Sequence, residues 1–269
     1  MARRVQRLDA ELVRRRLARS REHAVELITA GRVQVRGVTA TKPATGVTTA
    51  AAVHVRDDVD DPGYASRGGH KLAGALAVFA DIRVAGRRCL DAGASTGGFT
   101  DVLLRHGAAQ VVAVDVGYGQ LAWSISTDPR VQVVDRTNVR SLTPAMIGGR
   151  AQLTVADLSF ISLGLVLPAL AACTEPDGDL LPMVKPQFEV GKDLLGPGGV
   201  VRDPQLRAEA VVAVSENAAT LGWLTAGVCR SPLPGPAGNV EFFLWLQRAP
   251  AQPLHSDEIA RIVASSETQ

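Results

Sequence analysis

The chain has 269 residues, of which 46% are hydrophobic and 21% are charged, a composition that excludes a fibrous or fully disordered protein. Its net charge of +2 conceals an asymmetry, because residues 1–43 carry 11 basic against 4 acidic side chains and the remainder carries 18 against 23. A small basic segment on a mildly acidic body favours a polyanionic partner for one end of the chain. A basic helix that simply faces solvent is the alternative.

Three cysteines, Cys89, Cys173 and Cys229, lie far apart and in no metal-ligand spacing. This pattern favours a reducing cytoplasm over a disulfide framework, and it predicts no metal site. The first residues are charged and lack the apolar run of a signal peptide, and the apolar stretch 151–173 is too polar to span a bilayer. We therefore expect a cytoplasmic protein without a membrane segment.

The basic segment predicts a compact α+β unit. A short helix is expected over Asp9–Arg16, and a second begins after Ser20, a good N-cap, and ends at Gly31. Val33 and Val35 alternate with polar residues, which indicates a half-buried strand. Such a unit is too small for a catalytic cleft but can display arginines: Arg15, Arg16, Arg19, Arg21, Arg32 and Arg36.

Acidic residues, proline and glycine then crowd together, and we place a linker at 61–68 between a domain over 1–60 and a second over 69–250, with a tail over 251–269. Helices are expected at 71–80, 98–105, 119–127, 162–172 and 204–221, and strands at 88–92, 110–116, 131–134, 153–158, 180–185, 224–229 and 240–246. This alternation predicts an α/β fold with a largely parallel, doubly wound sheet. The last two strands lack a helix between them and are expected to pair antiparallel at or near the sheet edge.

A glycine-rich loop, Asp91–Phe99, follows the first strand of the second domain. Its spacing, G-x-x-x-G-G, departs from the G-x-G-x-x-G of nicotinamide sites. It resembles instead the first motif of methyltransferases that use S-adenosylmethionine, with a purely structural turn as the alternative. The resemblance predicts cofactor contacts from Asp91, Gly93, Ala94, Ser95, Gly97 and Phe99.

Two further positions predict the rest of a nucleoside-binding site. Asp115 ends the next strand, where an acid is expected to hold ribose hydroxyls unless it only caps a turn. After the third strand, either Asp135 or Asn138 could bind an adenine amino group, and we favour Asn138.

The small number of lysines and their positions indicate a catalytic role for one of them. The chain has only four, against 25 arginines, and Lys185 directly follows the apolar run Leu180–Val184. Asp157 ends the preceding strand in the same way, so both should meet at the carboxyl edge of the sheet. A ribose hydroxyl must lose its proton to accept a methyl group, which a lysine of lowered pKa can achieve and an arginine cannot. A strand-end lysine that only reaches toward solvent is the alternative.

Motifs over residues 5–248 carry a closer resemblance. Lys71, Asp157, Lys185 and Glu241 match, in order, the tetrad of FtsJ-like ribose 2′-O-methyltransferases, and Arg7 to Gly37 resembles the RNA-binding domain of ribosomal protein S4. The whole chain resembles the TlyA family in its local sequences Ser66–Leu72, Asp91–Phe99, Asp115–Leu121, Ala156–Ser162, Val184–Glu189 and Gly238–Glu241.

The resemblance implies a Rossmann-like domain that uses S-adenosyl-L-methionine to methylate cytidine ribose in 16S or 23S ribosomal RNA, or both, with Lys185 as general base. It also implies an effect on susceptibility to tuberactinomycin antibiotics such as capreomycin, and a historical haemolysin label. The residues expected to contact RNA are Arg7, Arg19, Arg21, Arg32 and Arg36.

Other functions remain as alternatives: a membrane-active haemolysin, a non-catalytic ribosomal RNA-binding protein, or a base N-methyltransferase. The last commonly has Asn-Pro-Pro-Tyr or Asp-Pro-Pro-Tyr after the fourth strand, whereas this chain has Asp157-Leu158-Ser159-Phe160. One departure from mycobacterial members lies in the linker, where Pro62-Gly63-Tyr64-Ala65 replaces a basic, tryptophan-containing tetrapeptide. Coupling between RNA docking and cofactor affinity through that linker is therefore not carried over.

Overall fold

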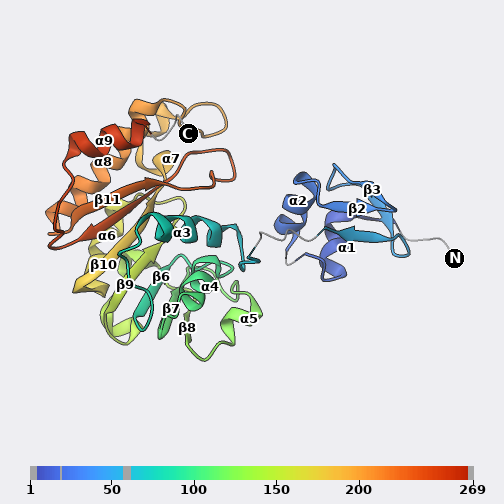
Figure 1. The fold of residues 1–269 in the computed structure, drawn as a ribbon, viewed down its shortest axis with the longest axis horizontal. Coiled ribbons are helices and arrows are strands. Elements are labelled where there is room, and N and C mark those ends of the chain that lie inside the picture. The colour runs from blue at the N-terminus through green and yellow to red at the C-terminus, as the bar shows by residue number, and fades with distance from the viewer. Residues whose placement is uncertain (1–4, 19, 57–61, 266–269) are drawn as a thin grey trace. The chain divides into compact units, whose positions relative to one another are not determined.

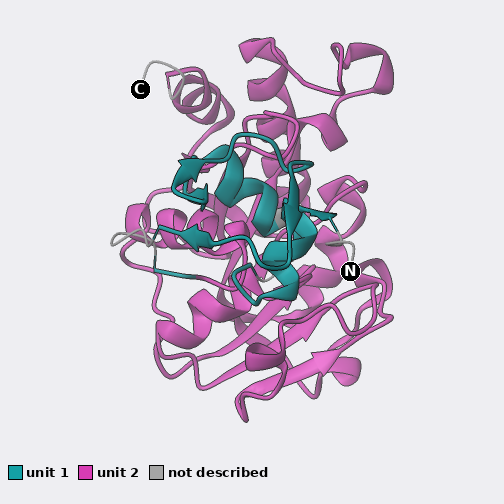
Figure 2. Cartoon of the chain, turned by 90° about the vertical axis from the view of Figure 1, so that its right-hand side faces the viewer, with its two compact units in different colours: residues 1–63 teal, residues 64–269 magenta. Residues whose placement is uncertain are grey.

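The computed structural model describes residues 5–18, 20–56 and 62–265 (Figure 1) and divides the chain into two compact units, 1–63 and 64–269 (Figure 2). Tyr64 and Ala65, which the sequence places in the linker, belong to the second unit. The Arg105 guanidinium lies 4.9 Å from the centre of the Tyr64 ring, and the Ala65 amide donates to Asp101 Oδ2 at 2.8 Å. The chain is thus anchored from Tyr64 onward.

The first unit is a small α+β domain. Its elements are β1 (Val5–Arg7), α1 (Leu8–Arg14), α2 (Arg21–Thr29), β2 (Val33–Val35), β3 (Val38–Thr39), β4 (Gly46–Thr48) and β5 (Val53–Val55). β1 pairs with β4, and β2 lies between β3 and β5 in a second antiparallel sheet. The two helices exist because Leu12, Leu27 and Ile28 can be buried together, and because Ser20 Oγ accepts the His23 amide at the start of α2.

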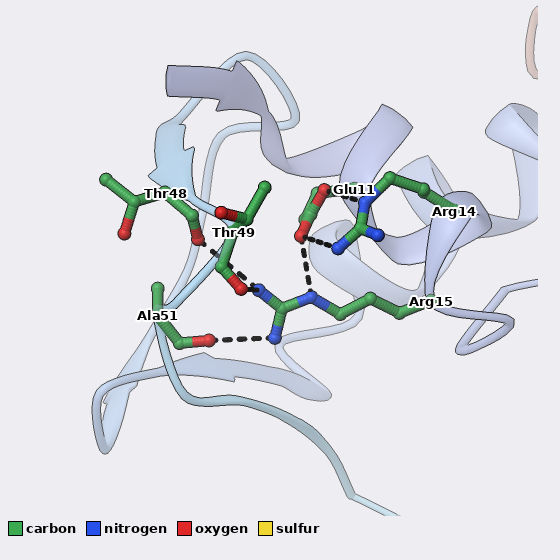
Figure 3. Close-up of polar contacts among 6 residues, drawn as sticks. All are labelled: Glu11, Arg14, Arg15, Thr48, Thr49 and Ala51. Atoms are coloured by element: carbon green, nitrogen blue, oxygen red, sulfur yellow. Dashed lines mark hydrogen bonds and ion pairs between the residues drawn. The ribbon is translucent and has the colours of Figure 1, made fainter. Parts of the chain in front are cut away.

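An ion cluster holds α1 to the chain that follows β4 (Figure 3). The Glu11 carboxylate is fully buried and accepts hydrogen bonds from Arg14 and Arg15. Arg15 donates onward to the carbonyl oxygens of Ala51 at 2.7 Å and Thr49 at 2.9 Å. Arg15, one of the arginines expected on the surface, is only partly exposed and stabilises the fold, because its guanidinium satisfies these two carbonyls.

The second unit contains a seven-stranded sheet in the order β11-β12-β10-β9-β6-β7-β8. These strands are β6 (Arg88–Ala92), β7 (Gln110–Val114), β8 (Val131–Val134), β9 (Ala151–Ala156), β10 (Thr174–Val184), β11 (Leu224–Arg230) and β12 (Phe242–Gln247). The pairs from β8 to β10 are parallel, while β12 is antiparallel to both β10 and β11. The predicted doubly wound sheet is confirmed, with β11 at the edge and β12 inserted beside β10.

Helices cover both faces of this sheet, as Figure 1 shows. α3 (Arg67–Val78), α4 (Gly98–Arg105) and α5 (Trp123–Ser126) contribute to one hydrophobic cluster, and α6 (Leu167–Cys173), α8 (Pro204–Thr220) and α9 (Ser256–Ser265) contribute to the other. Because both faces are buried, central strands are apolar throughout, as Val111–Val114 illustrates. In the described part of the chain, no helix has the length and apolar character needed to cross a membrane.

Several elements differ in extent from expectation: α3 begins at Arg67 rather than at 71, α5 covers Trp123–Ser126 rather than 119–127, and α6 begins at Leu167 rather than at 162. β10 begins at Thr174 rather than at 180, with a register shift between Thr174 and Asp179 that accommodates the polar residues between them. The segment expected as a tail contains α9, in which Ile259 and Val263 are buried in the core cluster that α8 shares. The apolar face of a short helix is therefore enough to bring this segment into the fold.

Candidate active site

The strand order brings the candidate residues to one edge of the sheet. Gly93, Asp115, Asp157 and Lys185 are each the first residue after a parallel strand, so they share the carboxyl edge where α/β folds bind ligands. β12 runs in the opposite direction, with Phe242 paired to Val184. The residue before it, Glu241, is consequently placed at the same edge, beside Lys185.

The predicted quartet forms two ion pairs. Lys71 Nζ, from α3, lies 2.5 Å from Glu241 Oε2, and Lys185 Nζ lies 2.6 Å from Asp157 Oδ1. The residues Lys71, Lys185 and Glu241 are buried, with 6%, 8% and 1% of their surface exposed. A buried lysine without a carboxylate partner would be costly, so the two pairs explain how both lysines are retained in the interior.

Lys185 has a second oxygen neighbour. Its Nζ donates to Ser159 Oγ at 3.0 Å. The contact with Asp157 Oδ1 lacks hydrogen-bond angles, so it is an ion pair, and this buried oxygen has no hydrogen-bond donor among the described residues. The amine is therefore held between a carboxylate and a hydroxyl. Ser159 lies in the segment Ala156–Ser162 that resembles the TlyA family, but the sequence pattern gives it no role; its position two residues after Asp157 is the available signal.

Two cavities meet at this amine. A cavity of about 810 Å³ is lined by Lys185, Gln187, Glu241 and neighbouring residues. A second, of about 470 Å³, is lined by the glycine loop, Asp115 and Asp157. Ser159, Phe160 and Ile161 line both. The Asp157–Lys185 pair thus stands where the two spaces join, so one ligand in each could react beside it.

The glycine loop packs closely against the backbone of Asp157. Gly93 has φ of 89°, and a Cβ there would lie 2.5 Å from the Asp157 carbonyl oxygen. Gly97, with φ of 95°, caps the N-terminus of α4. The Ser95 amide donates to Asp115 Oδ2 at 2.8 Å, and the Gly117 amide donates to Asp115 Oδ1 at 2.7 Å. Backbone amides therefore fix this carboxylate at the wall of the smaller cavity.

Of the other predicted cofactor contacts, Asn138 lines the smaller cavity, whereas its alternative Asp135 does not line it. Phe99 does not reach the cavity, because its ring packs against Phe243 in the core with the ring centres 6.0 Å apart. Ala94 and Asp91 are buried and also stay outside the lining.

Asp91 is the buried first residue of the glycine loop. Thr100 Oγ1 donates to its Oδ2 at 2.6 Å, and its Oδ1 is buried without a hydrogen-bond partner. Burial raises the pKa of this carboxyl to about 7.

The arginines predicted to contact RNA are differently placed. Arg7 and Arg21 both pair with the buried Asp9, at 2.8 and 3.0 Å, and the Arg7 hydrogen bond holds the pKa of Asp9 well below its usual range. Arg32 Nε donates to the Arg56 carbonyl at 3.2 Å. Arg36 is exposed, at a tight turn with φ of 52°. Arg19 lies outside the described residues.

No group of three or more His, Cys, Asp or Glu side chains suited to hold a metal ion occurs within residues 5–18, 20–56 and 62–265.

Comparison with known proteins agrees with this geometry. Residues 64–248 match the FtsJ-like methyltransferase family, and residues 6–53 match the S4 domain. The chain is 65% identical to the 16S/23S rRNA (cytidine-2′-O)-methyltransferase TlyA of Mycobacterium tuberculosis, over 92% of this chain and 91% of that protein. It is 34% identical to hemolysin A of Brachyspira hyodysenteriae, over 88% of this chain and 97% of that protein.

A solved structure from Streptococcus thermophilus, described as a candidate hemolysin, superposes with a TM-score of 0.78 at 36% identity, covering 99% of this chain and 97% of that one. The haemolysin label therefore falls on proteins that share the fold described above. Matches of this extent over both units show that the chain belongs to the TlyA family of FtsJ-like methyltransferases with an N-terminal S4 domain.

Proposed function

We propose that this protein transfers a methyl group from S-adenosyl-L-methionine to the 2′-hydroxyl of a cytidine in ribosomal RNA, with Lys185 as the general base. The observation that carries the proposal is the Asp157–Lys185 pair at the junction of the two cavities. The choice of cytidine in ribosomal RNA as the substrate rests on the mycobacterial relative, a 16S/23S rRNA (cytidine-2′-O)-methyltransferase with 65% identity.

The smaller cavity fits the cofactor. Gly93 lines this cavity, and the fixed carboxylate of Asp115 suits a pair of ribose hydroxyls. Asn138 is placed to bind the adenine amino group, and the loop Asp91–Phe99 is expected to contribute through its backbone. When bound, S-adenosylmethionine supplies an electrophilic methyl group.

The larger cavity fits the target nucleoside. There Lys185 Nζ takes the proton of the 2′-hydroxyl while the ribose oxygen accepts the methyl group. Asp157 stabilises the ammonium that forms, because its carboxylate lies 2.6 Å away. Lys71 and Glu241 form a second pair from other elements, and we assign them a supporting role in holding the wall of the site.

The N-terminal unit is proposed to dock the RNA. Its S4 domain match and its basic surplus both favour phosphate contacts, while the remainder of the chain is net negative. Arg36 is an exposed candidate, with Arg7, Arg19, Arg21 and Arg32 as the others. Such contacts should set affinity and salt dependence rather than the choice of nucleotide.

The test is transfer of a tritiated methyl group to purified ribosomal subunits, followed by mapping of the modified nucleotide. Lys185→Ala should lower the rate by about 10²–10⁴-fold, the usual contribution of a general base. Lys185→Arg should be nearly as inactive, since a guanidinium cannot accept the proton. Lys42→Arg, the same substitution at an exposed lysine, should retain full activity.

An active Lys185→Arg variant would show that Lys185 contributes charge alone. Deleting residues 1–63 tests the docking role, and the remaining unit should bind cofactor yet methylate subunits poorly. Full activity of the truncated chain would exclude the N-terminal unit as the docking module.

A further inference from the structure

Ser159 restricts how the N–H bonds and the lone pair of the Lys185 amine can be oriented. A neutral lysine amine has two N–H bonds and one lone pair, arranged tetrahedrally around Nζ. Ser159 Oγ accepts one N–H at 3.0 Å, which fixes one direction around Nζ. The Asp157 carboxylate, whose Oδ1 lies 2.6 Å away without hydrogen-bond angles, attracts the second N–H by charge and repels the lone pair, so the lone pair occupies the direction that remains.

Lys185 lines the larger cavity, to which the target ribose is assigned. Ser159 lines both cavities, so it lies where they meet. We propose that Ser159 is a positioning residue: it accepts one N–H of Lys185 and so aims the lone pair of the neutral amine at the 2′-hydroxyl. This inference rests on the proposed function and deepens it.

The backbone around Ser159 is held on both sides. Before it, the Asp157 amide donates to the Ala92 carbonyl at 3.1 Å. After it, Phe160 has φ of 63°, a conformation that a bulky residue rarely adopts. Beyond the turn, Ser162 Oγ and the Leu163 amide donate to Glu189 at 2.6 and 2.8 Å. These contacts restrain the backbone on both sides of Ser159, which is itself exposed.

Without Ser159, the amine would keep its ion pair with Asp157 but lose the hydrogen bond to the hydroxyl. Rotation about the terminal bond of Lys185 would then let the lone pair turn away from the substrate for part of the time. The loss should fall on the rate of methyl transfer, since neither the carboxylate of Asp157 nor the cofactor loop is changed. We expect a decrease of about 10-fold, less than the about 10²–10⁴-fold that removal of the base itself causes.

The experiment compares Ser159→Thr with Ser159→Val, two side chains of almost equal shape of which only one has the hydroxyl. Ser159→Ala is the third variant. For each, kcat and KM for ribosomal subunits are measured at saturating S-adenosylmethionine, and the dissociation constant of the cofactor is measured by calorimetry. We expect kcat near the wild-type value for threonine and about 10-fold lower for valine and alanine, with KM and cofactor affinity within about 2-fold.

Equal kcat values for threonine and valine would overturn the proposal, because the hydroxyl would then have no role. Weaker cofactor binding in valine and alanine with unchanged kcat would also overturn it, and would make Ser159 a cofactor ligand. The wild-type protein is the separate check on the proposed function. If it methylates the 2′-hydroxyl while the valine variant matches it, only the role of Ser159 fails.

Discussion

Replacing Glu11 by glutamine should loosen the N-terminal unit, because this buried carboxylate neutralises two arginines at once. It accepts three hydrogen bonds of 2.7 Å, two from Arg14 and one from Arg15. Glutamine keeps the shape but removes the charge and faces the guanidinium groups with an amide that cannot accept as many bonds. Arg15, which also holds the carbonyls of Thr49 and Ala51, would lose its counter-charge (Figure 3).

The expected loss of unfolding free energy in Glu11→Gln depends on how far its ion pairs are shielded from water. Removing one partner of a buried ion pair costs about 3–5 kcal/mol. The Arg14 side chain is 50% exposed, so water recovers part of that loss, and we expect about 2–3 kcal/mol. A unit of this size has a total stability of roughly 3–9 kcal/mol, so the substitution should remove a large share of it.

The effect should also depend on pH. The hydrogen bond from Arg14 lowers the pKa of Glu11 from 4.5 to about 2. Because the folded state lowers this pKa, ionised Glu11 stabilises the unit above about pH 4.5, and its contribution disappears as the pH falls toward about 2. The glutamine variant should lack that part of the acid sensitivity.

Hydrogen–deuterium exchange of the full chain measures the change locally. Peptides from α1 and β4 should exchange roughly 30- to 150-fold faster in Glu11→Gln, while peptides from the seven-stranded sheet should be unaffected. Glu209→Gln, the same substitution at an exposed position of α8, is the control and should change neither set. Unchanged protection of α1 in Glu11→Gln would refute the reasoning.

Three further substitutions test the smaller cavity. Asp115→Ala should weaken S-adenosylmethionine binding by about 1.5–3 kcal/mol in calorimetry, and an unchanged affinity would remove Asp115 from the site. Gly93→Ala should lower Tm more than Gly86→Ala. Both positions have positive φ, but only at Gly93 would a Cβ meet a carbonyl oxygen, at 2.5 Å. Equal decreases in Tm would mean that this close packing is unimportant for stability. Burial raises the pKa of Asp91 from 3.8 to about 7, so ionisation of this carboxyl opposes folding, and the stability of the protein should fall as the pH rises from about 3.8 to about 7. Asp91→Asn should make the melting temperature depend less on pH over this range. An unchanged pH dependence would assign the effect to another group.

Much of the site was predictable because parallel strands end at a common edge. Asp115, Asp157 and Lys185 each follow an apolar run, and that pattern alone places them together. Glu241 could be assigned only through the family resemblance. Its position results from β12 running antiparallel to β10, which brings the start of one strand to the end of the other.

Side-chain direction was less predictable. Arg15 and Arg36 both belong to a basic segment, yet the first is bound into the fold and the second is exposed. Phe99 lies in the cofactor motif but packs into the core. Such outcomes depend on which neighbours the rest of the chain supplies, and no local pattern contains that information.

Taken by itself, the sequence determined the order of the strands and main helices of the second unit, the two-unit organisation and the chemical types at the strand ends, since hydrophobic periodicity and glycine spacing are local properties. Only the tertiary structure decided that Lys71 pairs with Glu241, 170 residues away, and that Lys185 lies between Asp157 and Ser159 where two cavities join. Contacts over such separations form when whole helices and strands pack, so their partners are selected by the shape of the core.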